Sequence, residues 1–205
     1  MGAGKGYLTF ALYDFLVNNL KIKADITGVE VRDDLVNKCN AIAQNVGFQN
    51  LQFEKGYITN YFLPKTDVLI ALHACDTATD DAIAKGIKSQ ADLIICAPCC
   101  HKQVRKLMNC QTHLQSMLQF GIHNDRLAEM LTDTIRALIL EANGYETSVS
   151  EFISTEHTGK NVMIIGKKRK ADNMGENPSF YLQQIEKLKE EFGVKFHYLE
   201  KLLLY

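Results

Sequence analysis

Two hydrophobic patterns alternate along the chain. Short apolar runs, typical of buried strands, are separated by segments whose apolar residues recur every three or four positions, as on one helical face. The strand candidates are Ile26–Val31, Leu51–Phe53, Asp67–Leu72 and Asp92–Cys96. The helix candidates are Tyr7–Leu20, Asp33–Val46, Asp80–Lys88 and Leu127–Asn143. This alternation predicts an α/β fold with a mostly parallel sheet and helices on both faces.

The first helix candidate carries a clear apolar stripe. Leu8, Leu12, Phe15 and Leu16 have the spacing of one buried helical face, so we expect them to point into the core.

The pattern changes towards the end of the chain. Tyr145–Ile153 and Asn161–Lys167 have the length and spacing of an antiparallel hairpin. An amphipathic helix, Ser179–Phe192, follows an Asn-Pro linker. We therefore expect a main domain over residues 1–170 and a linker with a helical appendage over residues 171–205.

Composition limits the function classes. The chain has 205 residues, 46% hydrophobic and 23% charged, with a formal net charge of -1. Nucleic-acid binders usually carry a strong basic excess, so an RNA-binding surface would have to be local. The basic run at residues 167–170 follows a strand candidate, and we interpret it as a solvated strand end.

The chain shows six cysteines and no secretory signal. This combination favours reduced thiols in the cytoplasm over a disulfide framework. No apolar run approaches the roughly 20 residues that a membrane-spanning helix needs, so we expect no membrane insertion.

A glycine-rich loop precedes the first helix candidate. Gly2, Gly4 and Gly6 stand at alternate positions, where glycine lets the backbone turn sharply and approach a ligand closely. A dinucleotide-binding loop needs a third glycine one residue later, and a Walker loop needs a Gly-Lys-Ser/Thr ending. Both of these alternatives are therefore disfavoured, and a nicotinamide-dependent oxidoreductase is the least favoured function.

An acidic residue ends the next strand candidate. Glu30 is placed so that its carboxylate can accept hydrogen bonds from ribose hydroxyls, as in dinucleotide folds. A solvated glutamate is the simpler alternative.

Two clusters of histidine and cysteine follow neighbouring strand candidates. Residues 72–80 read Leu-His-Ala-Cys-Asp-Thr-Ala-Thr-Asp, and residues 97–101 read Ala-Pro-Cys-Cys-His. Because ligands bind beyond the carboxyl ends of parallel strands, we expect both clusters to flank one cleft.

Together these motifs resemble class I methyltransferases that use S-adenosylmethionine. The glycine spacing is similar to their first motif, and H-x-C-x-x-A-T-D followed by C-C-H marks a subgroup. That subgroup includes eukaryotic tRNA ribose 2′-hydroxyl methyltransferases, the methyltransferase part of the glutathione S-transferase C-terminal domain-containing protein, and bacterial proteins, which fit best overall. The resemblance covers residues 1–169 and implies a Rossmann-like sheet of seven strands.

The resemblance implies a set of cofactor contacts. S-adenosylmethionine would meet the glycine loop and the acidic strand end, while adenine would lie against the segment after the next strand. The expected cofactor residues are Gly2, Gly4, Gly6, Glu30, Gly56, Tyr57, Ile58, Leu72 and His73. Core or loop packing is an equal alternative for Tyr57 and Ile58.

The resemblance also implies an acceptor, with RNA as the expected class. For a hydroxyl acceptor, His73, Asp76 or His101 would remove the proton, with His73 preferred. Asp76 departs from the tRNA enzymes, which carry glycine there, and no zinc-finger segment like theirs is present. A noncatalytic interaction module that keeps the fold is the alternative function.

The segment before the fourth helix candidate offers secondary substrate residues. His123 and Arg126 would lie on the substrate side, although a helix cap supplied by Asn124 or Asp125 is the simpler interpretation.

A metal site in the histidine-cysteine clusters is an alternative. Thiolates and imidazole are good zinc ligands, but adjacent Cys99 and Cys100 lack the usual C-x₂-C spacing. We therefore expect no metal, and reduced cysteines lining a cleft.

The glycine loop follows Met1 directly, whereas this fold places a central strand before it. We expect that strand, and an upstream domain that contacts RNA, in a longer form of the protein. Without it, neighbouring strands lose backbone partners at about 1 to 3 kcal/mol for each buried group, and an exposed sheet edge or dimerisation is expected.

Overall fold

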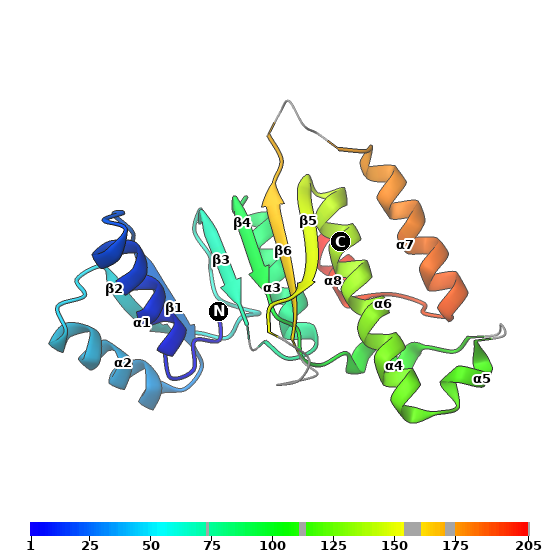
Figure 1. The fold of residues 1–205 in the computed structure, drawn as a ribbon, viewed down its shortest axis with the longest axis horizontal. Coiled ribbons are helices and arrows are strands. Elements are labelled where there is room, and N and C mark those ends of the chain that lie inside the picture. The colour runs from blue at the N-terminus through cyan, green and yellow to red at the C-terminus, as the bar shows by residue number, and fades with distance from the viewer. Residues whose placement is uncertain (73, 111–113, 154–160, 171–174, 205) are drawn as a thin grey trace. The chain divides into compact units, whose positions relative to one another are not determined.

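The computed structural model describes residues 1–72, 74–110, 114–153, 161–170 and 175–204, and these form two compact units. The first unit comprises Met1–Phe62 and the second Leu63–Tyr205 (Figure 1). The domain boundary expected at residue 170 stays a prediction.

The first unit is built around two parallel strands. Strands β1 (Ile26–Glu30) and β2 (Leu51–Lys55) pair in parallel, and helix α2 (Asp33–Asn45) connects them. Helix α1 (Tyr7–Tyr13) continues as a π-helical segment, Asp14–Asn19. The unit therefore begins as the expected helix–strand–helix–strand series.

The inward face of the first helix differs from the sequence expectation. Leu8 and Phe15 are about half exposed, whereas Phe10 and Tyr13 pack against the core. The Tyr13 ring stacks on Phe48 at 4.5 Å between centroids, and its hydroxyl accepts a hydrogen bond from Asn50 N–H. Contacts of the larger aromatic side chains thus determine which face of the helix is buried, and this is not the face that the leucine stripe predicts.

The second unit contains a four-stranded sheet in the order β3-β4-β6-β5. Strands β3 (Val68–Ala71) and β4 (Leu93–Cys96) are parallel, and Ala71 lies opposite Cys96 at their carboxyl ends. Strands β5 (Tyr145–Glu151) and β6 (Val162–Lys168) form the expected antiparallel hairpin, and β6 also pairs antiparallel with β4.

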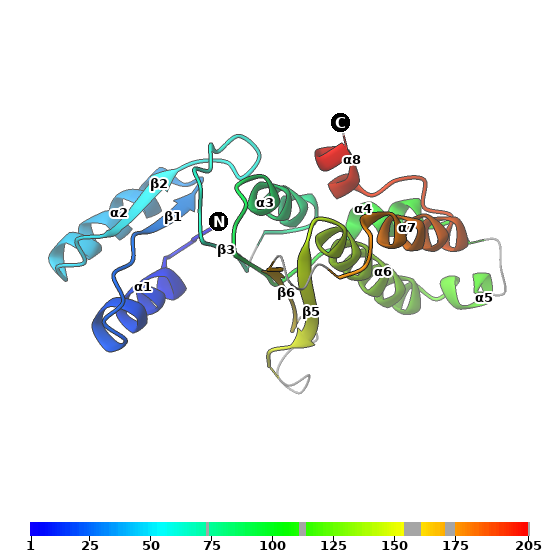
Figure 2. The ribbon, with the colours of Figure 1, turned by 90° about the horizontal axis from the view of Figure 1, so that it is seen from above.

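Helices α3 (Thr77–Lys88) and α6 (Gly121–Ala142) lie on the same side of this sheet (Figure 2). Two shorter helices, α4 (Lys102–Leu107) and α5 (Gln115–Leu118), pack against α6. Helix α6 starts at Gly121, so Asn124 and Asp125 lie inside its first turns, and the cap expected from them is wrong.

The C-terminal helices belong to the second unit. Helix α7 (Pro178–Phe192) packs against α6, and helix α8 (Tyr198–Leu204) packs mainly against α3. Asn177 caps α7 through a hydrogen bond from Ser179 N–H. Lys189 on α7 and Glu200 on α8 form an ion pair at 2.8 Å. None of the helices over the described ranges is long and apolar enough to cross a bilayer.

Candidate functional site

The glycine loop holds a backbone that only glycine adopts easily. Gly2, Gly4 and Gly6 have φ angles of 70°, 56° and 76°, in the left-handed region. A Cβ at Gly2 or Gly4 would meet nothing within 4 Å, so the backbone there is open to a ligand. At Gly6 a Cβ would lie 3.0 Å from the Phe53 ring, so this glycine is also needed for packing.

Glu30 lies against this loop at the end of β1. Gly4 N–H donates a 2.7 Å hydrogen bond to Glu30 Oε2, while Arg32 donates to Oε1 from its backbone N–H and from Nε, each at 3.3 Å. Burial alone would raise the pKa of Glu30, but these hydrogen bonds and the Arg32 charge lower it below its usual value. The buried glutamate is therefore an ionised hydrogen-bond acceptor beside the glycine loop.

The segment after β2 is anchored to the same strand. Gly56 N–H donates to the Glu30 carbonyl oxygen at 3.0 Å, which places the segment beside the end of β1. The Tyr57 side chain is 63% exposed and Ile58 is half-buried, so Tyr57 is not a core residue. The first unit thus brings together seven expected cofactor residues: Gly2, Gly4, Gly6, Glu30, Gly56, Tyr57 and Ile58.

The two histidine-cysteine clusters follow β3 and β4 in the second unit. Asp76 Oδ1 accepts a hydrogen bond from Gln103 N–H at 3.2 Å, which ties the first loop to the start of α4. Asp76 has φ 53° and ψ −121°, a conformation that favours glycine. Glycine would therefore adopt this backbone more easily than Asp76 does.

A buried charge network lies behind these loops. Arg136 on α6 donates to Asp80 Oδ1 at 2.7 Å, to Asp133 Oδ1 at 3.1 Å and to the Asp76 carbonyl at 2.9 Å. Burial alone would lower the pKa of Arg136, but the two carboxylates raise it above its usual value. Burial also raises the pKa of Asp80, against the attraction of Arg136.

His101 joins this network from the second loop. Its Nε2 lies 3.2 Å from Asp133 Oδ1, and both side chains are buried. Among the residues that the structure describes, no hydrogen bond involves His101 Nδ1. The pair has the arrangement of a base oriented by a carboxylate.

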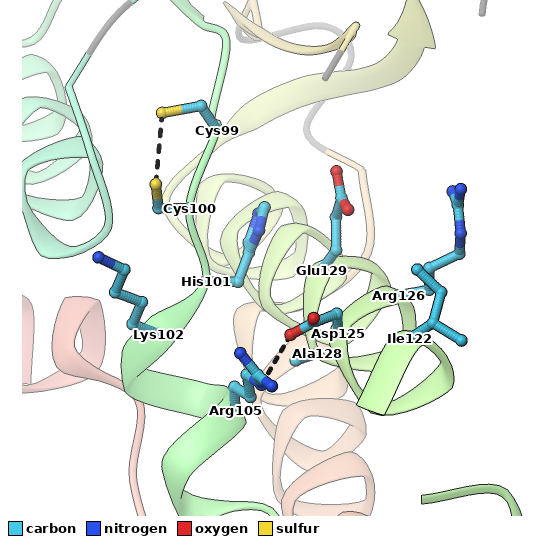
Figure 3. A pocket seen from close by; sticks show the side chains of 10 residues that line it. All are labelled: Cys99, Cys100, His101, Lys102, Arg105, Ile122, Asp125, Arg126, Ala128 and Glu129. Atoms are coloured by element: carbon cyan, nitrogen blue, oxygen red, sulfur yellow. Dashed lines mark hydrogen bonds and ion pairs between the residues drawn. The ribbon is translucent and has the colours of Figure 1, made fainter. Parts of the chain in front are cut away.

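A pocket of about 350 Å³ opens beside His101 (Figure 3). It lies between the second loop, α4 and the start of α6. Its lining includes three cations, Lys102, Arg105 and Arg126, and two acids, Asp125 and Glu129. Arg105 and Asp125 form an ion pair at 2.6 Å.

Three thiols meet next to this pocket. Cys75 Sγ lies 3.2 Å from Cys99 Sγ, and Cys99 Sγ lies 3.7 Å from Cys100 Sγ. Burial and hydrogen bonding with the other two thiols raise the pKa of Cys99 to about 12.

The structure sorts the expected residues into two groups. The glycine loop, Glu30 and the Gly56 segment lie together in the first unit. Asp76 and His101 lie in the second unit, where a hydrogen bond from Gln103 N–H connects the loop of Asp76 to the start of α4. Leu72 follows β3 in the second unit, and His73 lies outside the described residues. The assignments of catalytic and cofactor roles stay predictions.

Sequence reasoning missed Asp133, Arg136 and Arg105. The first two are buried charges on an amphipathic helix, where the helical pattern alone gives them no distinct role. A buried arginine with two aspartates signals a functional or structural network only once its surroundings are known.

The residues of the first unit fit the expected cofactor. The open backbone at Gly2 and Gly4 can approach the methionine part, and the ionised Glu30 can accept hydrogen bonds from ribose hydroxyls. Gly4 N–H is hydrogen-bonded to the Glu30 carboxylate, so the loop and the glutamate are close enough to contact a single ligand.

Comparison with known proteins tests this interpretation. A family model described as a methyltransferase domain matches residues 1–107, just over half of the chain. This match favours methyl transfer over the oxidoreductase alternative.

Curated relatives agree with the family model. The chain is 25% identical to the glutathione S-transferase C-terminal domain-containing protein of Homo sapiens, over 69% of this chain and 26% of that protein. The corresponding protein of Mus musculus is 24% identical over the same shares. The chain thus spans about a quarter of the length of these relatives.

Solved structures share the fold at low identity. The methyltransferase domain of bacterial CtHen1-C matches with a TM-score of 0.51 and 12% identity, over 82% of this chain and 87% of that one. A dimethyladenosine transferase from Plasmodium falciparum matches with a TM-score of 0.50 and 13% identity, over 98% of this chain and 76% of that one. The expected Rossmann-like methyltransferase fold is confirmed. The chain belongs to the methyltransferase-domain family.

Proposed function

We propose that this chain transfers a methyl group from S-adenosylmethionine to a hydroxyl of RNA. The observation that carries the proposal is His101, paired with Asp133 behind it, in the wall of a pocket that also presents Lys102, Arg105 and Arg126. The resemblance of its motifs to tRNA ribose methyltransferases supports the same class of acceptor.

His101 serves as the general base in this proposal. If Nε2–H donates to Asp133, the neutral imidazole has its lone pair on Nδ1, which can take the proton of an acceptor hydroxyl. Asp133, itself bound by Arg136, orients the imidazole through its contact with Nε2. When bound, S-adenosylmethionine would supply an electrophilic methyl group for the acceptor oxygen.

The pocket cations bind the RNA backbone in this proposal. Arg105 is already paired with Asp125, whereas Lys102 and Arg126 show no ion pair within the described part of the chain. Phosphate contacts position a nucleic acid without reading its sequence. Such a local basic site reconciles RNA binding with a net charge of -1.

A cytoplasmic location and a contact with further RNA-binding segments complete the proposal. All six cysteines are free thiols, which fits a reducing compartment.

Labelled S-adenosylmethionine tests the function directly. The chain is incubated with total RNA, protein and metabolite fractions, and we expect label in RNA, recovered as a methylated nucleoside after nuclease digestion. His101→Gln keeps a donor for Asp133 but removes the base, so the rate should fall by about 10² to 10⁴. Affinity for S-adenosylmethionine should not change.

Arg126→Ala should raise the KM for RNA and leave kcat nearly unchanged, because it removes a backbone contact. Lys187→Ala, an exposed change on α7, is the matched control. Label in protein or metabolites alone would refute RNA as the acceptor, and no transfer to any fraction would favour a noncatalytic module.

A further inference from the structure

We propose that Cys75, Cys99 and Cys100 form a zinc site with an open fourth position. The three Sγ atoms all lie within 4.8 Å of one another. This site goes beyond the proposed function and does not depend on it.

The topology brings the thiols together. Cys75 follows β3 and Cys99 and Cys100 follow β4, and the two strands are parallel neighbours. Parallel pairing continues past the strands, because Ala97 N–H donates to the Ala71 carbonyl at 3.1 Å. The two loops therefore leave the same sheet edge side by side.

The spacing of the sulfurs fits one ion. Tetrahedral zinc with zinc–sulfur bonds of about 2.3 Å separates its sulfur ligands by roughly 3.8 Å. The two measured separations, 3.2 and 3.7 Å, lie near that value. A small outward movement of Cys75 would complete the arrangement.

Contacts behind the thiols hold both loops in place. Gln103 N–H donates to Asp76 Oδ1, and the Thr79 hydroxyl donates to the Ala74 carbonyl. Outer contacts of this kind orient metal ligands and reduce the cost of assembling a site. Cys75 is exposed, so an ion can enter from solvent.

Three convergent thiols favour a metal over a disulfide. A Cys75–Cys99 disulfide would use two of them and leave Cys100 without a role. Soft thiolates select zinc among the common divalent ions. The C-x₂-C spacing rule misses this site, because the third ligand comes from a different loop.

Metal analysis of the reduced full chain tests the site. We expect about one zinc ion per chain after dialysis without chelator, bound through three sulfurs at about 2.3 Å in X-ray absorption. Cobalt titration of the metal-free chain should give a thiolate charge-transfer band that saturates at one equivalent and disappears on adding zinc.

Single changes Cys75→Ser, Cys99→Ser and Cys100→Ser should each weaken zinc binding at least about tenfold. Cys110→Ser is the matched control, since Cys110 is a buried thiol that donates to the Glu191 carbonyl elsewhere in the unit. If these variants fail to fold, the cobalt and absorption spectra of the unchanged chain still decide.

Fewer than three sulfur ligands, no cobalt–thiolate band, or a Cys75–Cys99 disulfide in place of bound metal would overturn the proposal. Because the readout is metal content, its failure leaves the methyl-transfer proposal unaffected.

Discussion

Gly4 N–H donates a 2.7 Å hydrogen bond to the carboxylate of Glu30, 26 residues further along the chain. This bond joins the two sequence features from which the cofactor was predicted. The carboxylate that we predict to accept ribose hydroxyls therefore also orders the glycine loop.

Glu30→Ala should therefore weaken S-adenosylmethionine binding by about 10- to 100-fold, the loss expected for one or two hydrogen bonds to a charged group. Isothermal titration measures the affinity. Asp33→Asn is the matched control, because it removes a nearby carboxylate that, among the residues the structure describes, pairs only with the exposed Lys55. An affinity unchanged by Glu30→Ala would separate this glutamate from the cofactor.

The sequence predicted this part of the site because its signals are local. Gly2, Gly4 and Gly6 need left-handed backbone, and Glu30 ends a short apolar strand. Each signal can be recognised within a few residues. The order of helices and strands was predicted for the same reason.

The buried network could not be predicted in this way. Arg136 meets Asp80 across 56 residues, and its contacts depend on how α6 packs against the loop before α3. The leucine stripe of the first helix also predicted the wrong buried face, because Phe10 and Tyr13 pack on the core instead. Tertiary contacts decide both cases.

Variants of Asp76 should reveal the energetic cost of its strained backbone. Asp76→Ala removes the acceptor for Gln103 N–H but keeps a side chain at φ 53°, whereas Asp76→Gly removes both the acceptor and the strain. We expect the alanine variant to be less stable than the glycine variant by roughly 1 kcal/mol. Urea denaturation compares them, and an alanine variant of equal or higher stability would show that the strain is small.

Asp76→Asn tests a catalytic role at the same position. The amide keeps an acceptor for Gln103 N–H but cannot act as a base. If His101 is the base, RNA methylation should change by less than about tenfold, in contrast to His101→Gln. A loss as large as that of His101→Gln would move the role of base to Asp76.

Arg136→Lys should destabilise the chain by about 3 to 5 kcal/mol. Lysine cannot present the planar fork that contacts Asp80, Asp133 and the Asp76 carbonyl, so buried acceptors lose their partners. Arg105→Lys, in an ion pair that is about half exposed, should cost less than about 1 kcal/mol. Similar losses of stability in the two variants would show that the contacts of the buried Arg136 guanidinium contribute little.

The buried His197 side chain should make the stability of the chain depend on pH. Its Nδ1 accepts a hydrogen bond from Leu199 N–H, while Nε2 is buried without a partner in the described part of the chain. Burial, helped by the charges of Arg136 and Lys189, lowers the pKa of His197 from 6.5 to about 3. The folded chain therefore keeps this imidazole neutral where the unfolded chain binds a proton.

Because the unfolded state binds more protons between these two pKa values, stability from this group is present above pH 6.5 and is lost as the pH falls towards 3. Between pH 7 and pH 5 the loss should be about 2 kcal/mol. His197→Asn keeps an acceptor for Leu199 N–H but does not titrate, so its free energy of unfolding should fall less over the same interval. Denaturant unfolding at the two pH values measures both slopes, and equal slopes would assign the acid sensitivity to other groups.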